Sequence, residues 1–204
     1  MQRRHYYDQL ISVSDFSGPW SECIKGFKYR AQLSLARPLT DLLLQRIRHL
    51  QVPDHGWASW QVIGMPMARR RRWRRGYNQA ELLAQRIACG LGAPYLTTVK
   101  RVIHTPALEK QSRLERARTM NQVFTAPSLQ GGCLVIDDVF TTGASVNELA
   151  RTLRTQGAQR IVVATLARTP INGDNHCNWL GQVFHDTLDA TDETGNPQRS
   201  AKRW

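Results

Sequence analysis

The chain has 204 residues, of which 41% are hydrophobic and 22% charged, a composition that excludes wholly disordered and low-complexity classes and fits one α/β domain or one domain with a small appendage. Lys and Arg number 28 against 16 Asp and Glu, a formal net charge of +12, which predicts an anionic partner such as a polyphosphorylated small molecule, nucleic acid or an anionic membrane surface. Since no apolar stretch is long enough to span a membrane and no apolar leader follows Met1, we expect a cytoplasmic protein.

The first part of the chain predicts one strand and two helices. Apolar and polar residues alternate over 9–16, as in a strand with one buried face, before Gly18 and Pro19 break the pattern. Pro19 suits the start of a short helix over 20–27, and Pro38 suits the first position of a second helix. The apolar face of that second helix comprises Leu39, Leu42, Leu43, Ile47 and Leu50.

The middle of the chain predicts a strand, a helix and a further strand. Trp60 begins a short apolar run that stops at Gly64 or Pro66, directly before a run of arginines. A helix over 80–91 follows, with Gly90 and Gly92 as its stop. The segment 96–103 is another strand candidate, and the charged connection 104–120 is long enough to indicate a functional loop.

The last part of the chain predicts a strand, a helix and a strand. Cys133 begins an apolar run without alternation, typical of a strand covered on both faces, and two aspartates end this run. We expect a helix from about Ala144 to Gln156, with Gly157 as its stop, and then a buried strand over 160–167. Two such strands joined by a helix form a right-handed parallel βαβ unit, so the sequence predicts an α/β fold with a parallel sheet.

The segment from Cys133 to Ser145 holds the candidate binding residues. Ligands of open parallel sheets bind beyond the carboxyl ends of the strands, where Asp137 and Asp138 stand. Adjacent carboxylates repel, so we interpret the pair as acceptors for hydroxyls or as ligands of a divalent cation. The next residues offer hydroxyls and free backbone N–H groups at the positive end of a helix, which makes an anion cradle. The cradle residues are Thr141, Thr142, Gly143, Ala144 and Ser145.

The two carboxylates can accept hydrogen bonds from vicinal hydroxyls, and the cradle beside them can hold one phosphate. Together these features predict a ribose 5-phosphate ligand. If a pyrophosphate is also present, Asp137 and Asp138 would help to hold Mg²⁺. The alternative is structural, in that two aspartates simply end a strand and the polar turn simply caps a helix. We prefer the ligand interpretation, because the motif is long and lies in the strand–turn–helix context that phosphate binding requires.

The same segment resembles the phosphoribosyl pyrophosphate (PRPP) binding motif of type I phosphoribosyltransferases. A second stretch, from Arg75 to Ala84, resembles the Arg-Gly-Phe-Asn-Gln segment of the competence-associated ComF family, also called GntX-like proteins. Members often begin with a four-cysteine zinc-binding region, which has no counterpart here, since the four cysteines are far apart. The resemblance spans about residues 6 to 170 and includes Lys28, Tyr29, Gln111, Arg116, Asn121 and Phe124.

This resemblance implies a type I phosphoribosyltransferase-like domain over 1–171, a parallel sheet flanked by helices with a small hood from the N-terminal part, and a polar, partly disordered tail over 172–204. It implies an enzyme that uses Mg²⁺ and transfers phosphoribosyl from PRPP to an unidentified acceptor with release of pyrophosphate. A closing lid over 104–118 would supply Lys110 or Arg116 as catalytic candidates. The pyrophosphate-binding candidates are Arg74, Arg75, Gly76 and Asn78.

Six arginines surround Trp73 between Arg69 and Arg75, and three interpretations of this run stay open. It is a solvated charged surface, a pyrophosphate site that needs only its last two arginines, or a nucleic-acid site in which Trp73 stacks on a base. The alternatives to an enzyme are therefore a non-catalytic DNA uptake or processing protein that binds single-stranded DNA, and a PRPP-sensing regulator. A homo-oligomer is compatible with the sequence but not indicated by it. The nucleic-acid candidates are Arg69, Arg70, Arg71, Arg72 and Trp73.

Overall fold

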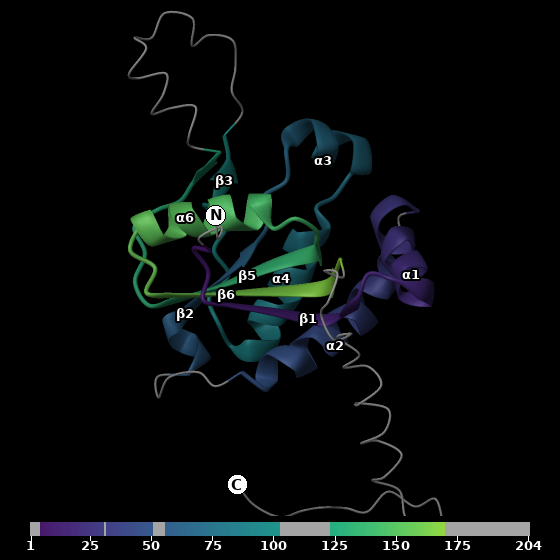
Figure 1. The fold of residues 1–204 in the computed structure, drawn as a ribbon, viewed down its shortest axis with the longest axis horizontal. Coiled ribbons are helices and arrows are strands. Elements are labelled where there is room, and N and C mark those ends of the chain that lie inside the picture. The colour runs from purple at the N-terminus through teal and green to yellow at the C-terminus, as the bar shows by residue number, and fades with distance from the viewer. Residues whose placement is uncertain (1–4, 31, 51–55, 103–122, 170–204) are drawn as a thin grey trace, which may run out of the picture.

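A four-stranded sheet with the strand order β1-β6-β5-β2 forms the centre of the molecule (Figure 1). The computed structural model describes residues 5–30, 32–50, 56–102 and 123–169. Every pairing in this sheet is parallel, so the predicted α/β class with a parallel sheet is confirmed. The strands are β1 (Gln9–Asp15), β2 (Trp60–Gly64), β5 (Gly132–Phe140) and β6 (Arg160–Arg168).

Helices cover both faces of the sheet (Figure 1). Alternate residues of β5 divide between two core layers: Leu134 and Ile136 pack with α2 and α4, whereas Cys133 and Val135 pack with α6. This burial on both faces explains why the apolar run of β5 lacks alternation. The covering helices are α2 (Ala36–Arg48), α4 (Gln79–Leu91) and α6 (Ala144–Thr155).

Two further helices lie near the carboxyl ends of β5 and β6, the side to which the arrowheads of these strands point in Figure 1. They are α1 (Gly18–Tyr29) and α3 (Arg69–Arg75). Two short strands, β3 (Lys100–Arg101) and β4 (Phe124–Thr125), pair antiparallel apart from the main sheet. The elements are completed by 3₁₀ turns at Leu33–Leu35 and Trp57–Ser59.

Several predicted helix boundaries are wrong: α1 begins at Gly18 instead of residue 20, and α2 ends at Arg48, before Leu50. Pro38 is the third residue of α2 rather than the first, because a 3₁₀ turn leads into the helix at Ala36. A proline is tolerated there, since the N–H groups of a first turn have no intrahelical partner. Gly90 lies inside α4, and Gly92 alone ends it in the left-handed conformation, with φ of 66°.

The strand predictions also need correction. Of the predicted strand 96–103, the described residues 96–102 contribute only the two-residue β3. Strand β5 continues through both aspartates and pairs with β6 as far as Phe140, opposite Arg168. The arginine run, for which the sequence predicted no element, forms α3. Among the described helices, none is long and apolar enough to cross a membrane.

Two predicted segments lie outside the described residues. They are the lid, with Lys110 and Arg116, and the polar tail over 172–204. The division into a domain over 1–171 with a hood and a separate tail therefore stays a prediction.

Candidate ligand-binding site

A cleft of about 390 Å³ opens at the carboxyl end of β5. Segments far apart in the chain meet there: the end of α1, residues 65–67 after β2, part of α3, and the whole of 137–146. The predicted carboxylates and every predicted cradle residue line this one space. This position, beyond the carboxyl edge of a parallel sheet, is where open α/β folds bind ligands.

Backbone hydrogen bonds hold the two aspartates at the end of β5. The N–H of Asp138 donates to Oδ1 of Asp137 at 2.8 Å, and the N–H of Val139 donates to Oδ1 of Asp138 at 2.6 Å. Both carboxylates line the cleft and are only partly exposed. These bonds restrict the orientation of both carboxylates, as a preorganised polar site requires.

Lys28, at the end of α1, forms an ion pair with Asp138. Its Nζ lies 2.8 Å from Oδ1 of the aspartate, and the two side chains are only 15% and 14% exposed. The partner of this lysine is more than a hundred residues away in the sequence, so no local pattern could reveal the pair. The only signal was the Lys28-Tyr29 resemblance, from which no site role had been inferred.

Asp137 carries the largest electrostatic perturbation in the cleft. Burial, and then the negative charge of Asp138, raise the pKa of Asp137 from 3.8 to about 7. The nearby cations Lys28 and Arg71 oppose this rise but do not cancel it. An unliganded carboxyl with such a pKa is poised to be ionised by a ligand that donates hydrogen bonds or brings positive charge.

The polar turn between β5 and α6 is shaped by Gly143. This residue has φ of 70°, and a Cβ on it would lie 2.4 Å from Cζ of Phe140, so a larger residue meets both strain and a clash. Thr141, Thr142 and Ser145 are exposed and line the cleft. The first turn of α6 contains no acidic residue, which leaves its positive dipole end uncompensated and favourable for an anion.

The Arg-Gly-Tyr-Asn-Gln motif joins α3 to α4 and fixes the far wall of the cleft. Gly76 ends α3 in the left-handed conformation, and Asn78 accepts a hydrogen bond from the N–H of Ala80 at the start of α4. The buried Gln79 accepts from Arg75 at 3.4 Å and donates to the carbonyl of Lys28 at 3.2 Å. The motif thereby links α1, α3 and α4 around the site.

Two of the predicted pyrophosphate-binding residues, Gly76 and Asn78, have structural roles in this connection. Gly76 is not among the residues that line the cleft, and its visible role is to end α3. Asn78 lines the cleft, but it is buried, and its amide also donates to the carbonyl of Met65 at 3.0 Å. A pyrophosphate role for these two residues stays a prediction, whereas their structural roles are evident.

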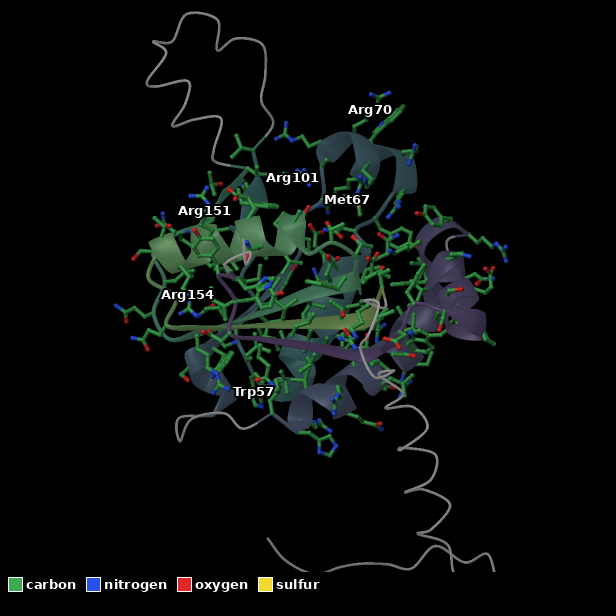
Figure 2. The ribbon with its side chains drawn as sticks, viewed as in Figure 1. Trp57, Met67, Arg70, Arg101, Arg151 and Arg154 are labelled. Carbon is green, nitrogen blue, oxygen red and sulfur yellow. The ribbon has the colours of Figure 1, made fainter. Side chains whose placement is uncertain are left out.

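The arginines of α3 divide into two sets. Those that line the cleft are Arg71, Arg74 and Arg75; Arg74 and Arg75 follow Arg71 by three and four positions and so share its face of the helix. Arg69, Arg70 and Trp73 do not line it, and Trp73 is 89% exposed. Figure 2 shows Arg70 on the side of α3 away from the sheet. The sequence had grouped Arg71 with the nucleic-acid candidates and had not singled out Arg101, which also lines the cleft.

Arg72 is engaged in an ion pair. Its guanidinium lies 3.0 Å from Oε1 of Glu81 in α4, which ties the two helices together. Its side chain is 55% exposed, so this pair contributes little to stability.

The cleft residues suit Mg²⁺ only if a phosphorylated ligand supplies some of the oxygens that bind the ion. Within the described ranges, no group of three or more His, Cys, Asp or Glu residues could hold a metal ion. One of the two cleft carboxylates is already paired with Lys28. Mg²⁺ commonly binds through one or two carboxylates, several waters and substrate phosphates, and Asp137 and Asp138 fit that arrangement.

The fold and the cleft define an α/β protein with a polar ligand site at the carboxyl edge of its parallel sheet. No protein-family model matches the chain. DNA utilization protein YhgH from Salmonella typhimurium is 34% identical over 178 residues, which cover 83% of this chain and 76% of that protein. Competence protein F from Haemophilus influenzae is 32% identical over 168 residues, which cover 79% and 73%. The chain therefore belongs to the ComF-like family of these two proteins, as its motifs indicated.

Among solved structures, a purine phosphoribosyltransferase from Pyrococcus horikoshii Ot3 aligns with a TM-score of 0.40 and 16% identity. The alignment covers 70% of this chain and 79% of that chain.

Proposed function

We propose that the cleft binds PRPP and that the protein transfers its phosphoribosyl group to an acceptor. This proposal rests on one observation: carboxylates, a hydroxyl-bearing helix N-terminus and a group of arginines all line the same cleft. Adjacent carboxylates suit vicinal hydroxyls, a helix N-terminus with three hydroxyl side chains suits a monophosphate, and a cluster of arginines suits a pyrophosphate.

The 5-phosphate would lie on the turn formed by 141–145. Backbone N–H groups at the start of α6 have no intrahelical acceptors, and Thr141, Thr142 and Ser145 add hydroxyl donors on the same side. The ribose hydroxyls would donate to Asp137 and Asp138, which follow directly from β5. A ribose 5-phosphate would therefore be held along one continuous segment of chain.

The pyrophosphate would lie against Arg71, Arg74 and Arg75. One guanidinium group can donate two parallel hydrogen bonds to phosphate oxygens, and it stays charged at every physiological pH. Arginines therefore favour a leaving group that gains negative charge. Mg²⁺ bound with the pyrophosphate would neutralise part of that charge. Lys28, which is already in the cleft beside Asp138, adds a further positive charge on this side.

In the transfer, a lone pair of the acceptor forms the new bond to C1 of the ribose. The bond from C1 to the pyrophosphate oxygen breaks, its electron pair leaves with pyrophosphate, and the acceptor proton passes to solvent or a base. The carboxylates favour positive charge that develops on the ribose, and the arginines favour the departing anion. The described residues thus position the reactants and stabilise charge, while Lys110 and Arg116 stay predicted lid residues.

A second candidate function is binding of single-stranded DNA on the outer face of α3. Trp73 is 89% exposed, and the neighbouring Arg69 and Arg70 are exposed as well. An exposed ring among cations is typical of surfaces on which bases stack while phosphates are neutralised. Two relatives carry the names DNA utilization protein and competence protein, which favours this candidate.

Calorimetric titration tests the ligand. Wild-type protein should bind ribose 5-phosphate, and PRPP with Mg²⁺ more tightly. Replacing Thr141, Thr142 and Ser145 together by Ala should weaken ribose 5-phosphate binding by about tenfold or more, since hydrogen bonds to a charged group each contribute about 1.5–3 kcal/mol. Thr155→Ala, an exposed threonine at the other end of α6, is the matched control and should change nothing. Equal affinities of all three proteins would contradict the proposal.

Release of pyrophosphate tests the transfer. Incubation of PRPP and Mg²⁺ with a panel of amines, purines and pyrimidines should release pyrophosphate with at least one acceptor. If PRPP binds but no acceptor of any class releases pyrophosphate, the protein is a PRPP sensor and not a transferase.

A further inference from the structure

A second hollow, of about 380 Å³, adjoins the cleft between the end of α1 and the end of α3. Of its lining residues, Lys28, Tyr29, Arg74 and Arg75 also line the cleft, whereas Tyr77 belongs to the hollow alone. The two spaces are therefore adjacent and share a wall. A ribose 5-phosphate on the turn 141–145 would leave the hollow open.

Side-chain hydrogen bonds from the α3–α4 connection hold the walls of the hollow in place. The hydroxyl of Tyr77 donates to the carbonyl of Phe27, and the amide of Gln79 donates to the carbonyl of Lys28 at 3.2 Å. The last carbonyls of a helix lack intrahelical partners, so these two bonds fasten the end of α1. The positions of Lys28 and Tyr29 are thus set by the fold without a ligand.

The lining of the hollow is cationic. Three of its five residues are Lys28, Arg74 and Arg75, and no acidic residue of the described chain lines it. Asp138, which pairs with Lys28, lines the cleft and not the hollow. Because Lys28 is already paired with Asp138, Arg74 and Arg75 are the cations that favour a negatively charged small molecule here.

The lining also offers a flat surface. Tyr29 is 66% exposed, and the guanidinium of Arg75 packs over its ring as a cation–π pair, with the guanidinium carbon 4.7 Å from the ring centre. The Nε of Arg75 is buried, and no described residue accepts a hydrogen bond from it. Because the Arg75 guanidinium covers one face of the ring, a planar ligand would stack on the opposite face, with its acid group drawn to the cations that line the hollow.

We infer that this hollow binds a planar, negatively charged small molecule, such as an aromatic or heteroaromatic carboxylate. The volume suits a single ring with its substituents better than a large cofactor. The hollow shares Arg74 and Arg75 with the pyrophosphate position of the proposed function, so the planar anion would compete with PRPP for these two arginines and would not be its acceptor. The binding itself depends only on Tyr29 and the same two arginines.

Ligand-observed NMR with three small probes tests the inference. Benzoate is planar and charged, cyclohexanecarboxylate is charged but not planar, and benzamide is planar but neutral. Benzoate should bind about fivefold tighter than either of the others, as expected when stacking and charge each contribute. Tyr29→Ala should weaken benzoate binding about fivefold, whereas Leu33→Ala, which removes another exposed apolar side chain outside the hollow, should not.

Several outcomes overturn the inference. These are equal binding of benzoate and cyclohexanecarboxylate, an unchanged benzoate affinity in Tyr29→Ala, and displacement of benzoate by ribose 5-phosphate. A single-stranded oligothymidylate that needs Tyr29 while benzoate does not would also overturn it, in favour of a nucleic-acid site. If benzoate binds as expected and ribose 5-phosphate does not bind at all, the proposed function fails and the hollow remains a site for planar anions.

Discussion

The two faces of α3 carry the same residue type in different surroundings. On one face, Arg71, Arg74 and Arg75 line the cleft that also contains the two aspartates. On the other, Arg69 and Arg70 lie outside that cleft, beside the exposed Trp73. A run of arginines is therefore not one functional unit, because helical spacing assigns its members to two surfaces.

The largest expected effect is the loss of ligand binding in the cleft when its two aspartates are replaced. Replacing Asp137 and Asp138 by Asn should lower PRPP affinity about 100-fold or more, since two charged hydrogen-bond acceptors and two potential Mg²⁺ ligands disappear. The fold should persist, because both residues stand at a strand end that faces the cleft. Calorimetry measures the affinity, and circular dichroism checks the fold. If the double variant folds and binds PRPP with wild-type affinity, the two aspartates do not bind the ribose.

Removing the cleft face of α3 should have the next largest effect. Arg71→Ser with Arg74→Ser should weaken PRPP binding about tenfold, which is less than for the aspartates because both arginines are exposed and screened by solvent. The same variant should bind ribose 5-phosphate almost as well as the wild type, because that ligand lacks the pyrophosphate. Equal losses for both ligands would mean that these arginines do not recognise the pyrophosphate specifically.

Removing the outer face should give the reciprocal result. Arg69→Ser with Arg70→Ser and Trp73→Ala should weaken binding of single-stranded DNA and reduce the slope of log affinity against log salt by about 1.4, since each lost phosphate contact removes about 0.7. PRPP affinity should stay within about twofold of the wild type. Fluorescence anisotropy across a salt series measures the first effect and calorimetry the second. If instead PRPP affinity falls and DNA binding persists, the division of α3 into two faces is wrong.

The smallest expected effect is on the stability of the unliganded protein. Since the pKa of Asp137 rises from 3.8 to about 7 on folding, the folded state binds more protons than the unfolded state between these values. The free energy of unfolding should therefore fall as the pH rises from about 4 to about 7, by about 2 kcal/mol once solvent exposure is considered.

Denaturant titrations without Mg²⁺ at several pH values measure this dependence. In Asp137→Asn, the fall across that window should be reduced, and the variant should be more stable than the wild type at pH 8. If the free energy of unfolding depends on pH in the same way in both proteins, folding does not raise the pKa of Asp137.

The sequence predicted the strand–turn–helix unit well because its signals are local. The apolar run before Asp137, the polar turn and the apolar spacing of α6 lie within about 25 consecutive residues, so each indicates the next. The cleft lies at the carboxyl end of that strand, which is the edge where open parallel sheets bind ligands. The same reasoning predicted the two aspartates and the turn 141–145, and all of these residues line the cleft.

What the sequence could not indicate depends on contacts between distant segments. The pairing of Lys28 with Asp138 joins two elements that only the assembled sheet and helices bring together. The helix at Arg69–Arg75 has no apolar face, so hydrophobic periodicity gave no sign of it, and Arg71 was assigned by its neighbours in sequence instead of by its helical face. The role of Gln79 between Arg75 and Lys28 also appears only in the folded chain.

A crystal structure of the protein with PRPP and Mg²⁺ would show whether the cleft at the end of β5 is the PRPP site. The 5-phosphate should lie on the backbone N–H groups of Ala144 and Ser145, the ribose hydroxyls on Asp137 and Asp138, and the pyrophosphate beside Arg74. A structure in which PRPP lies elsewhere, with the turn 141–145 and both carboxylates free of ligand, would contradict this placement.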